Sequence, residues 1–295
     1  MPAEGLPWLP APELLSTAEL VRLVRLATTL GIDEVRLTGG EPLLRPDVVS
    51  LVAQLAGAAE LSATTNGLVL DRLAPALKAA GLSRVNISID TLRRDRFLAM
   101  TRRDRLDDVF AGITAALRAG LHPVKLNTVL MRGVNDDEAV ELLRFALDTG
   151  VHLRFIEQMP LDAQHAWRRE EMVTAEEILR DLSLVFSLEP VASRGSAPAE
   201  EFYVDGTLQT VGVIGSVTRP FCGACDRLRL TADGQLRTCL FARTETDLRG
   251  PLRAGASDGD LAELILRAVL GKQAGHGIDD PTFLQPPRPM SAIGG

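Results

Sequence analysis

All three cysteines of the chain lie within 18 consecutive residues, at Cys222, Cys225 and Cys239. A C-x₂-C pair on a turn presents two thiolates to one metal site, and a hairpin turning at Asp233-Gly234 would bring the third thiolate back. No fourth cysteine exists and the four histidines are distant in sequence, so the site either recruits a distant ligand or leaves one coordination position open. An iron–sulfur cubane with one free iron fits this pattern, as does a three-cysteine zinc with an activated water; inert buried thiols are the alternative.

Two arginines follow the C-x₂-C pair directly. Arg227 and Arg229 are two residues apart, and on a strand this spacing places both on one face. Two guanidiniums that point the same way suit phosphate oxygens, because each can bind in a bidentate manner. A solvated basic face that also includes Arg237 and Arg243 is the alternative.

Three further cations lie within predicted strands, at Arg36, Lys125 and Arg154. Taken singly, each cation is best interpreted as the ion-pair partner of a carboxylate. Three cations on three strands instead favour a polar barrel interior lined by cations. Gly39-Gly40 at one strand end would let a ligand approach backbone N–H groups. Glu41 could bind an amine there, and a plain turn before Pro42 is the alternative.

The first 160 residues alternate helical and strand patterns, beginning with a capping box at Ser16 to Glu19. The predicted strands are 34–38, 62–65, 84–89, 124–130 and 153–157. The predicted helices between them are 20–30, 47–55, 71–80, 106–119 and 136–148. Five strands separated by helices predict a parallel sheet, either open or rolled into a barrel. The chain opens on a proline-rich loop and a helix, where such folds normally begin with a strand.

Beyond Met159 the pattern changes to a helix at 174–182, short β-like segments at 201–204 and 208–214, a hairpin over 228–240 and a helix near 261–270. We therefore expect two regions, an α/β barrel core over 1–160 and a C-terminal α+β extension over 161–295 that carries the cysteines.

Composition excludes several classes of protein. Hydrophobic residues make up 46% and charged residues 24%, which is typical of a globular chain. The net charge of −7 and the low aromatic content make nucleic acid an unlikely partner, and no apolar run is long enough to cross a membrane. The odd cysteine count and the lack of a secretory signal indicate a reducing, cytoplasmic location.

These motifs together carry a family resemblance. Gly39-Gly40-Glu41-Pro42 after one strand, Thr64-Thr65-Asn66-Gly67 after the next and Ser88-Ile89-Asp90 after the third resemble the S-adenosylmethionine radical enzymes. The segment from Phe221 to Arg229, together with Cys239 and the terminal Gly294-Gly295, is similar to the GTP 3′,8-cyclase family of molybdenum cofactor (molybdopterin) synthesis. The resemblance runs from end to end of the chain.

The resemblance implies a partial TIM-type (β/α)₆ barrel and two 4Fe–4S clusters. The N-terminal cluster would reduce S-adenosylmethionine to a 5′-deoxyadenosyl radical that abstracts the ribose 3′ hydrogen of GTP, after which C3′ attacks guanine C8. The C-terminal cluster, on the three cysteines, would hold the guanine at its open iron. A homodimer and the downstream cyclic pyranopterin monophosphate synthase are the protein partners it implies.

Residue roles follow from the same resemblance. S-adenosylmethionine would bind at Gly40, Ser88 and Met159. GTP would bind at Arg36, Thr64, Lys125, Arg154, Arg227, Leu228 and Arg229. The tail residues Gly294 and Gly295 would enter the barrel and assist catalysis.

One part of the family pattern is missing. In the family, a C-x₃-C-x₂-C motif directly precedes the segment that matches residues 1–5, and this chain lacks that motif, the first strand and an arginine expected to touch GTP. We expect a misplaced or truncated start, and expect the 295 residues alone to cleave no S-adenosylmethionine. A non-catalytic guanine-nucleotide-binding barrel with a structural metal cluster is the alternative function.

Overall fold

The fold is built on a curved sheet whose strands run parallel through most of its width. The computed structural model describes residues 9–192, 194–275, 277–280 and 283–294. The main sheet has eight strands in the order β1-β2-β3-β4-β5-β8-β7-β6. Its parallel strands are β1 (Glu34–Leu37), β2 (Glu60–Thr65), β3 (Arg84–Ser88), β4 (Val124–Val129), β5 (His152–Ile156) and β8 (Thr210–Ile214). Two antiparallel strands, β7 (Glu200–Val204) and β6 (Leu188–Pro190), complete it.

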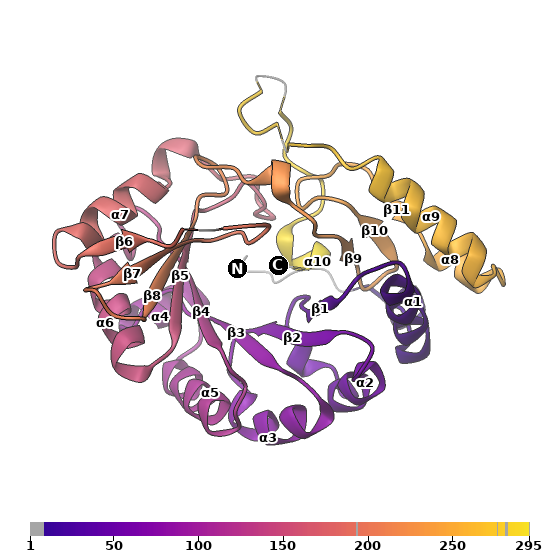
Figure 1. The fold of residues 1–295 in the computed structure, drawn as a ribbon, viewed down its shortest axis with the longest axis horizontal. Helices are drawn as coiled ribbons and strands as arrows, with labels where there is room; N and C mark the ends of the chain where they lie inside the picture. The colour runs from indigo at the N-terminus through magenta and orange to yellow at the C-terminus, as the bar shows by residue number, and fades with distance from the viewer. Residues whose placement is uncertain (1–8, 193, 276, 281–282, 295) are drawn as a thin grey trace.

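Helices cover the convex side of this sheet, as Figure 1 shows. They are α1 (Thr17–Thr29), α2 (Val48–Leu55), α3 (Leu70–Ala80), α4 (Arg94–Thr101), α5 (Leu106–Arg118), α6 (Ala139–Thr149) and α7 (Ala175–Ser183). The predicted capping box starts α1: Ser16 Oγ accepts from the Glu19 N–H at 3.2 Å, and the Ser16 N–H donates to the Glu19 carboxylate at 2.7 Å.

Alternation along the strands decides which side chains face the helices. On β4, Val124 and Leu126 are buried in the main core, whereas Lys125 and Asn127 face the other way. The same period of two places the apolar side chains of β2 and β3 against the helices. The concave side of the sheet therefore presents polar side chains such as Lys125 and Asn127, and we call this concave face the lumen.

The C-terminal part packs beside α1, at the β1 edge of the sheet (Figure 1). A small antiparallel sheet of β9 (Arg229–Leu230), β10 (Gln235–Arg237) and β11 (Thr246–Asp247) is followed by α8 (Arg249–Arg253) and α9 (Asp258–Leu270). A second apolar core joins α1, β10 and α9 through Leu23, Leu236 and Leu261. The short helix α10 (Met290–Ile293) lies inside the curve of the main sheet.

The predicted partial barrel is confirmed, and each of the five predicted strands is present with ends within three residues of the prediction. The predicted hairpin is also confirmed, since β9 and β10 pair across the turn that contains Asp233-Gly234. The predicted β-like segments at 201–204 and 208–214 are present as β7 and β8, but β8, whose residues are nearly all buried, lacks the alternation that would have placed it in the main sheet. Helix α4, which has no clear apolar stripe, was not predicted, and neither were the short elements α8, α10, β6 and β11.

The main sheet contains strands from both sides of residue 160, because β8 pairs in parallel with β5. Within the described residues, no helix has the length and apolar content that crossing a membrane requires.

Candidate functional site

The lumen carries three of the predicted cations on three strands of the main sheet, β1, β4 and β5. Strand register aligns Thr64 with Asn86, Asn86 with Lys125, and Asn127 with Arg154. Arg36 on β1 lies opposite Ser62 and donates to its hydroxyl at 3.3 Å. The structure therefore brings Arg36, Thr64, Lys125 and Arg154 to one concave face of the barrel, as predicted.

Arg154 is held firmly although it lies among other cations. It is only 7% exposed, and its Nε and Nη2 donate to the Asn127 side-chain oxygen at 3.0 and 2.8 Å. Gly212, its neighbour on β8, leaves the room that this side chain needs, since a Cβ there would lie 3.0 Å from Arg154 Cγ. Two bonds to one neutral amide orient the guanidinium without neutralising its charge.

The cations of the lumen repel one another. Burial, and next the nearby charge of Arg36, lower the pKa of Arg154 to about 10. Burial and the charge of Arg154 likewise lower the pKa of Lys125. Glu201 opposes both shifts, which identifies it as a carboxylate near the lumen.

Among the described residues, the predicted GTP-binding cations form no ion pair within 4.0 Å, whereas Arg84 on the same sheet pairs with Glu34 and Glu60. The partner carboxylates that each cation alone would favour are therefore not found. A cluster of cationic side chains without carboxylate partners is suited to bind a polyanion.

Arg229 extends the positive charge from the hairpin towards the barrel. Burial lowers its pKa to about 10, followed by repulsion from Arg227, and Arg36 contributes as well. Its guanidinium donates to the carbonyl of Gly294. Gly294 in turn lies against the end of β1, because a Cβ there would be 2.6 Å from Thr38 Oγ1 at a φ of +82°. The C-terminal tail thus reaches the lumen; Gly295 lies outside the described residues.

The predicted shared strand face of Arg227 and Arg229 is not found, because β9 begins only at Arg229. Arg227 instead stacks on the Phe221 ring at 4.8 Å, and its Nη2 lies 3.4 Å from Cys225 Sγ. Leu228 packs against the second apolar core. Of the other basic residues in this region, Arg237 is buried against Glu245, and only Arg243 is exposed.

The residues predicted to contact S-adenosylmethionine lie at the carboxyl ends of the strands. Gly40 is exposed, with no atom within 4 Å of where a Cβ would be, and Ser88 is exposed at the end of β3. Met159 is partly buried against the apolar cluster around Leu161. Glu41 binds the neighbouring loop, since its carboxylate accepts from Thr65 Oγ1 and the Asn66 N–H at 2.7 Å each. This contact favours the structural interpretation of Glu41.

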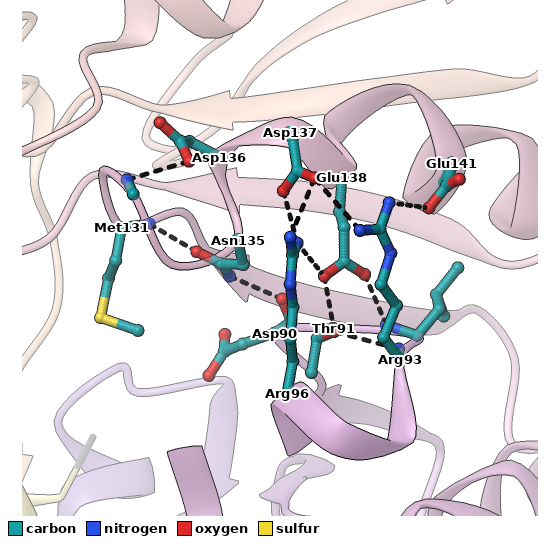
Figure 2. A network of polar contacts seen from close by, with 12 residues as sticks. Asp90, Thr91, Arg93, Arg96, Met131, Asn135, Asp136, Asp137, Glu138 and Glu141 are labelled. Carbon is teal, nitrogen blue, oxygen red and sulfur yellow. Dashed lines mark hydrogen bonds and ion pairs between the residues drawn. The ribbon is translucent and has the colours of Figure 1, made fainter. Parts of the chain in front are cut away.

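A buried polar network fixes the loop that follows Ser88 (Figure 2). The carboxylate of Glu138, which is fully buried, accepts from Thr91 Oγ1 at 2.7 Å, the Leu92 N–H at 2.9 Å and Arg96 at 2.8 Å. The Asn135 side chain donates to the Asp90 carbonyl at 2.6 Å. We call Thr91, Arg96, Asn135 and Glu138 the strand-end clamp, because they tie the loop after β3 to the loop after β4.

The cysteines occupy a turn and the hairpin end as predicted. Cys222 opens a 3-10 turn whose Cys225 N–H donates to the Cys222 carbonyl at 3.1 Å, and the Phe241 N–H points at Cys239 Sγ from 3.4 Å. Burial raises the pKa of Cys225, but hydrogen bonds from Arg227 and the charges of Arg227 and Lys272 outweigh it, so the pKa is lowered. Such surroundings stabilise thiolates, which are the ligands of iron and zinc.

No group of three His, Cys, Asp or Glu side chains in the described part of the chain converges on a single metal ion. A cubane differs from a single ion, because each cysteine binds a different iron, so its ligands need not meet at one point. The N–H groups aimed at two of the sulfurs and the nearby cations fit a cluster of net negative charge. The cluster itself stays a prediction.

Several residues of the site were not predicted. Asn127 and Asn86 could have been found, because each is two residues from a predicted site residue on the same strand. Gly212 and Lys272 could not, since each acts on a residue far away in sequence and no local pattern links the pairs.

Two protein families match the chain. Residues 4–146 match the Radical SAM superfamily, and residues 151–278 match the family described as Molybdenum Cofactor Synthesis C. The two matches meet near β5, where the barrel core passes into the C-terminal part.

Similar whole proteins carry one shared name. A protein of Streptomyces coelicolor named GTP 3′,8-cyclase is 61% identical, over all of this chain and 88% of its own length. Proteins of the same name from a Mycobacterium species and from Corynebacterium glutamicum are 56% and 53% identical, over all of this chain and over 86% and 82% of their own lengths.

Proposed function

Because the chain belongs to the GTP 3′,8-cyclase family of radical S-adenosylmethionine enzymes, we propose that its lumen binds GTP for conversion to (8S)-3′,8-cyclo-7,8-dihydroguanosine 5′-triphosphate in molybdenum cofactor synthesis. The observation that carries this proposal is the set of cations without ion-pair partners among the described residues: Arg36, Lys125, Arg154, Arg227 and Arg229. Three come from the barrel and two from the hairpin.

A triphosphate suits this arrangement for an electrostatic reason. Cations that lower one another's pKa values are held at a cost in free energy, and a bound polyanion relieves that repulsion. Arg154 is oriented by Asn127 before any ligand arrives, which reduces the entropy lost on binding. Thr64 adds a neutral hydrogen-bonding group on the same face.

Two separate groups of residues would bind the iron–sulfur cluster near the base and the S-adenosylmethionine. Cys222, Cys225 and Cys239 would hold a 4Fe–4S cluster beside the guanine, and Gly40, Ser88 and Met159 would bind S-adenosylmethionine at the strand ends. When bound, these groups supply the redox and hydrogen-abstraction chemistry of the reaction. The three cysteines all belong to the first of these sites, so the described residues supply thiolates for one cluster.

The tail would close the site. Arg229 holds the carbonyl of Gly294 beside Thr38, at the mouth of the lumen. A backbone carbonyl fixed there can orient a substrate hydroxyl and exclude water without adding charge. Our proposal gives Gly294 and Gly295 this positioning role.

From the family resemblance the proposal also takes a cytoplasmic location, a homodimer, and transfer of the product to cyclic pyranopterin monophosphate synthase.

Anaerobic calorimetric titration of the iron-loaded chain with GTP and with ATP tests the proposed function. We expect GTP to bind about tenfold or more tightly than ATP, because both carry the triphosphate but only one carries guanine. Equal affinity for the two nucleotides would contradict a guanine-reading site, and no binding of either would contradict the nucleotide site altogether.

A further inference from the structure

Lysine is rare in this chain, which carries 29 arginines and three lysines. Lys78 is exposed on α3, and Lys125 lines the lumen. The third, Lys272, follows the end of α9 and is half-buried beside the cysteines. A chain that otherwise uses arginine for its cations has a compact ammonium at this position.

The ammonium of Lys272 meets one acceptor for each of its three N–H groups. Nζ lies 2.7 Å from the Arg227 carbonyl, 2.5 Å from the Thr238 carbonyl and 3.6 Å from Cys225 Sγ. Arg227 is two residues after Cys225, and Thr238 directly precedes Cys239. One side chain therefore joins the turn that carries Cys225 to the strand end that carries Cys239.

We propose that Lys272 is a positioning residue for the three-cysteine site, which fixes the spacing of Cys225 and Cys239 and directs a positive N–H group at the Cys225 sulfur. This inference rests on the proposed function only for the identity of the cluster. Hydrogen bonds to cluster sulfurs and nearby positive charge raise the reduction potential, because they stabilise the more negative, reduced state.

An arginine could not take over all three contacts. The three acceptors belong to three separate residues around one nitrogen, and an ammonium donates in three tetrahedral directions. The guanidinium donors lie in one plane and are spread over three nitrogens.

The position of Lys272 also connects this site to the barrel. It follows α9, and α9 packs on α1. At the start of α9, Asp258 pairs with Arg22 of α1 at 2.8 Å. Lys272 thus fastens the cysteine hairpin to an element that is itself fixed on the barrel.

The test compares Lys272→Met with the wild type and with Lys78→Met, a matched loss of one exposed lysine. Because the chain holds only three cysteines, iron and sulfide per chain after anaerobic reconstitution report this site alone. We expect Lys272→Met to lose iron to a chelator about tenfold faster than either control, as is typical when a partner of a metal ligand is removed. We also expect the midpoint potential of the remaining cluster to fall.

Hydrogen exchange on the metal-free chain separates this inference from the proposed function. We expect amides of residues 222–242 to exchange about tenfold faster in Lys272→Met than in the wild type or Lys78→Met. Unchanged exchange together with unchanged iron retention would overturn the role of Lys272. If the wild type took up no iron, the proposed cluster would be contradicted, and hydrogen exchange on the metal-free chain would still test the role of Lys272. Wild-type behaviour of Lys272→Arg would overturn the need for a compact ammonium.

Discussion

At the scale of single residues, the lumen is defined by how each cation is held. Arg154 is fixed by Asn127, Arg229 is fixed by the carbonyl of Gly294, and Arg36 has only a long bond to Ser62. Arg154 is buried and Arg229 is partly buried, and the pKa of each falls to about 10, so both keep their charge at neutral pH. They are the positions where loss of charge should weaken phosphate binding most.

Arg229→Ala should weaken GTP binding by about tenfold or more, because a charge-assisted hydrogen bond contributes roughly 1.5–3 kcal/mol. The measurement is calorimetric titration with GTP. Arg243→Ala, an exposed arginine beyond the hairpin, is the matched control and should bind GTP as the wild type does. Equal losses in both variants would indicate a general charge effect and contradict the specific role of Arg229.

Asp90 gives the fold a pH dependence of known sign. Burial raises its pKa to about 6, opposed by the Val129 N–H, against an unfolded value of about 3.9. Since the folded chain holds this proton more tightly, the group stabilises the fold below about pH 4, and that contribution is lost as the pH rises through about 6.

Between about pH 4 and pH 7, the free energy of unfolding of the wild type should therefore fall by up to about 3 kcal/mol relative to that of Asp90→Asn, because the amide does not titrate. Urea unfolding of both proteins across this range measures the difference. If the free energies of unfolding of the two proteins changed equally with pH, the pKa of Asp90 would not be raised in the folded chain.

At the scale of elements, the strand-end clamp joins two loops that a parallel sheet leaves adjacent. The strand-borne cations in the sequence predicted a cation-lined barrel interior, and the register of β4 and β5 places Lys125 and Arg154 on one face of the sheet. The clamp was not predicted, because Thr91 and Glu138 are 47 residues apart and pair through loop conformation alone. The alternation of residues along a strand predicts on which side of the sheet a side chain lies, but it does not predict its hydrogen-bond partner on a distant loop.

Glu138→Gln should destabilise the fold by about 2 kcal/mol or more, since it removes the buried charge that Arg96 and two further donors contact. Urea unfolding gives the change in free energy. Glu141→Gln, which affects an exposed pair with Arg93, should stay within about 0.5 kcal/mol of the wild type. If both variants lost the same free energy of unfolding, the strand-end clamp would stabilise the fold no more than an exposed ion pair does.

At the scale of the whole molecule, the C-terminal part lies along one edge of the barrel and sends its tail into the lumen (Figure 1). The five βα repeats in the sequence predicted a parallel sheet, either open or rolled, and the family resemblance added the expectation of a partial barrel. The family resemblance predicted that the tail enters the barrel, but no local pattern in the sequence could show this, because the course of the tail depends on ion pairs between segments distant in sequence. Arg288 pairs with Asp233 at 2.9 Å and with Glu245 at 3.1 Å, and Glu245 also pairs with the buried Arg237.

Arg288→Gln should release the tail, because it leaves Asp233 and Glu245 with one fewer cation and weakens the bond to the Ala292 carbonyl. We expect amides of residues 283–294 to exchange about tenfold faster, as measured by hydrogen exchange. Arg267→Gln, which breaks an exposed pair with Glu263 on α9, is the control. Unchanged exchange in the tail would mean that Arg288 does not anchor it.

The central claim is that the cations of the lumen bind the phosphates of the nucleotide. Anaerobic titration of the iron-loaded chain with GTP, GDP, GMP and guanosine, in the wild type and in Arg154→Ala, tests it most directly. The account predicts that affinity falls with each phosphate removed, and that Arg154→Ala weakens GTP about tenfold or more while leaving guanosine unchanged. Equal affinity for GTP and guanosine, or an equal effect of Arg154→Ala on both, would contradict it.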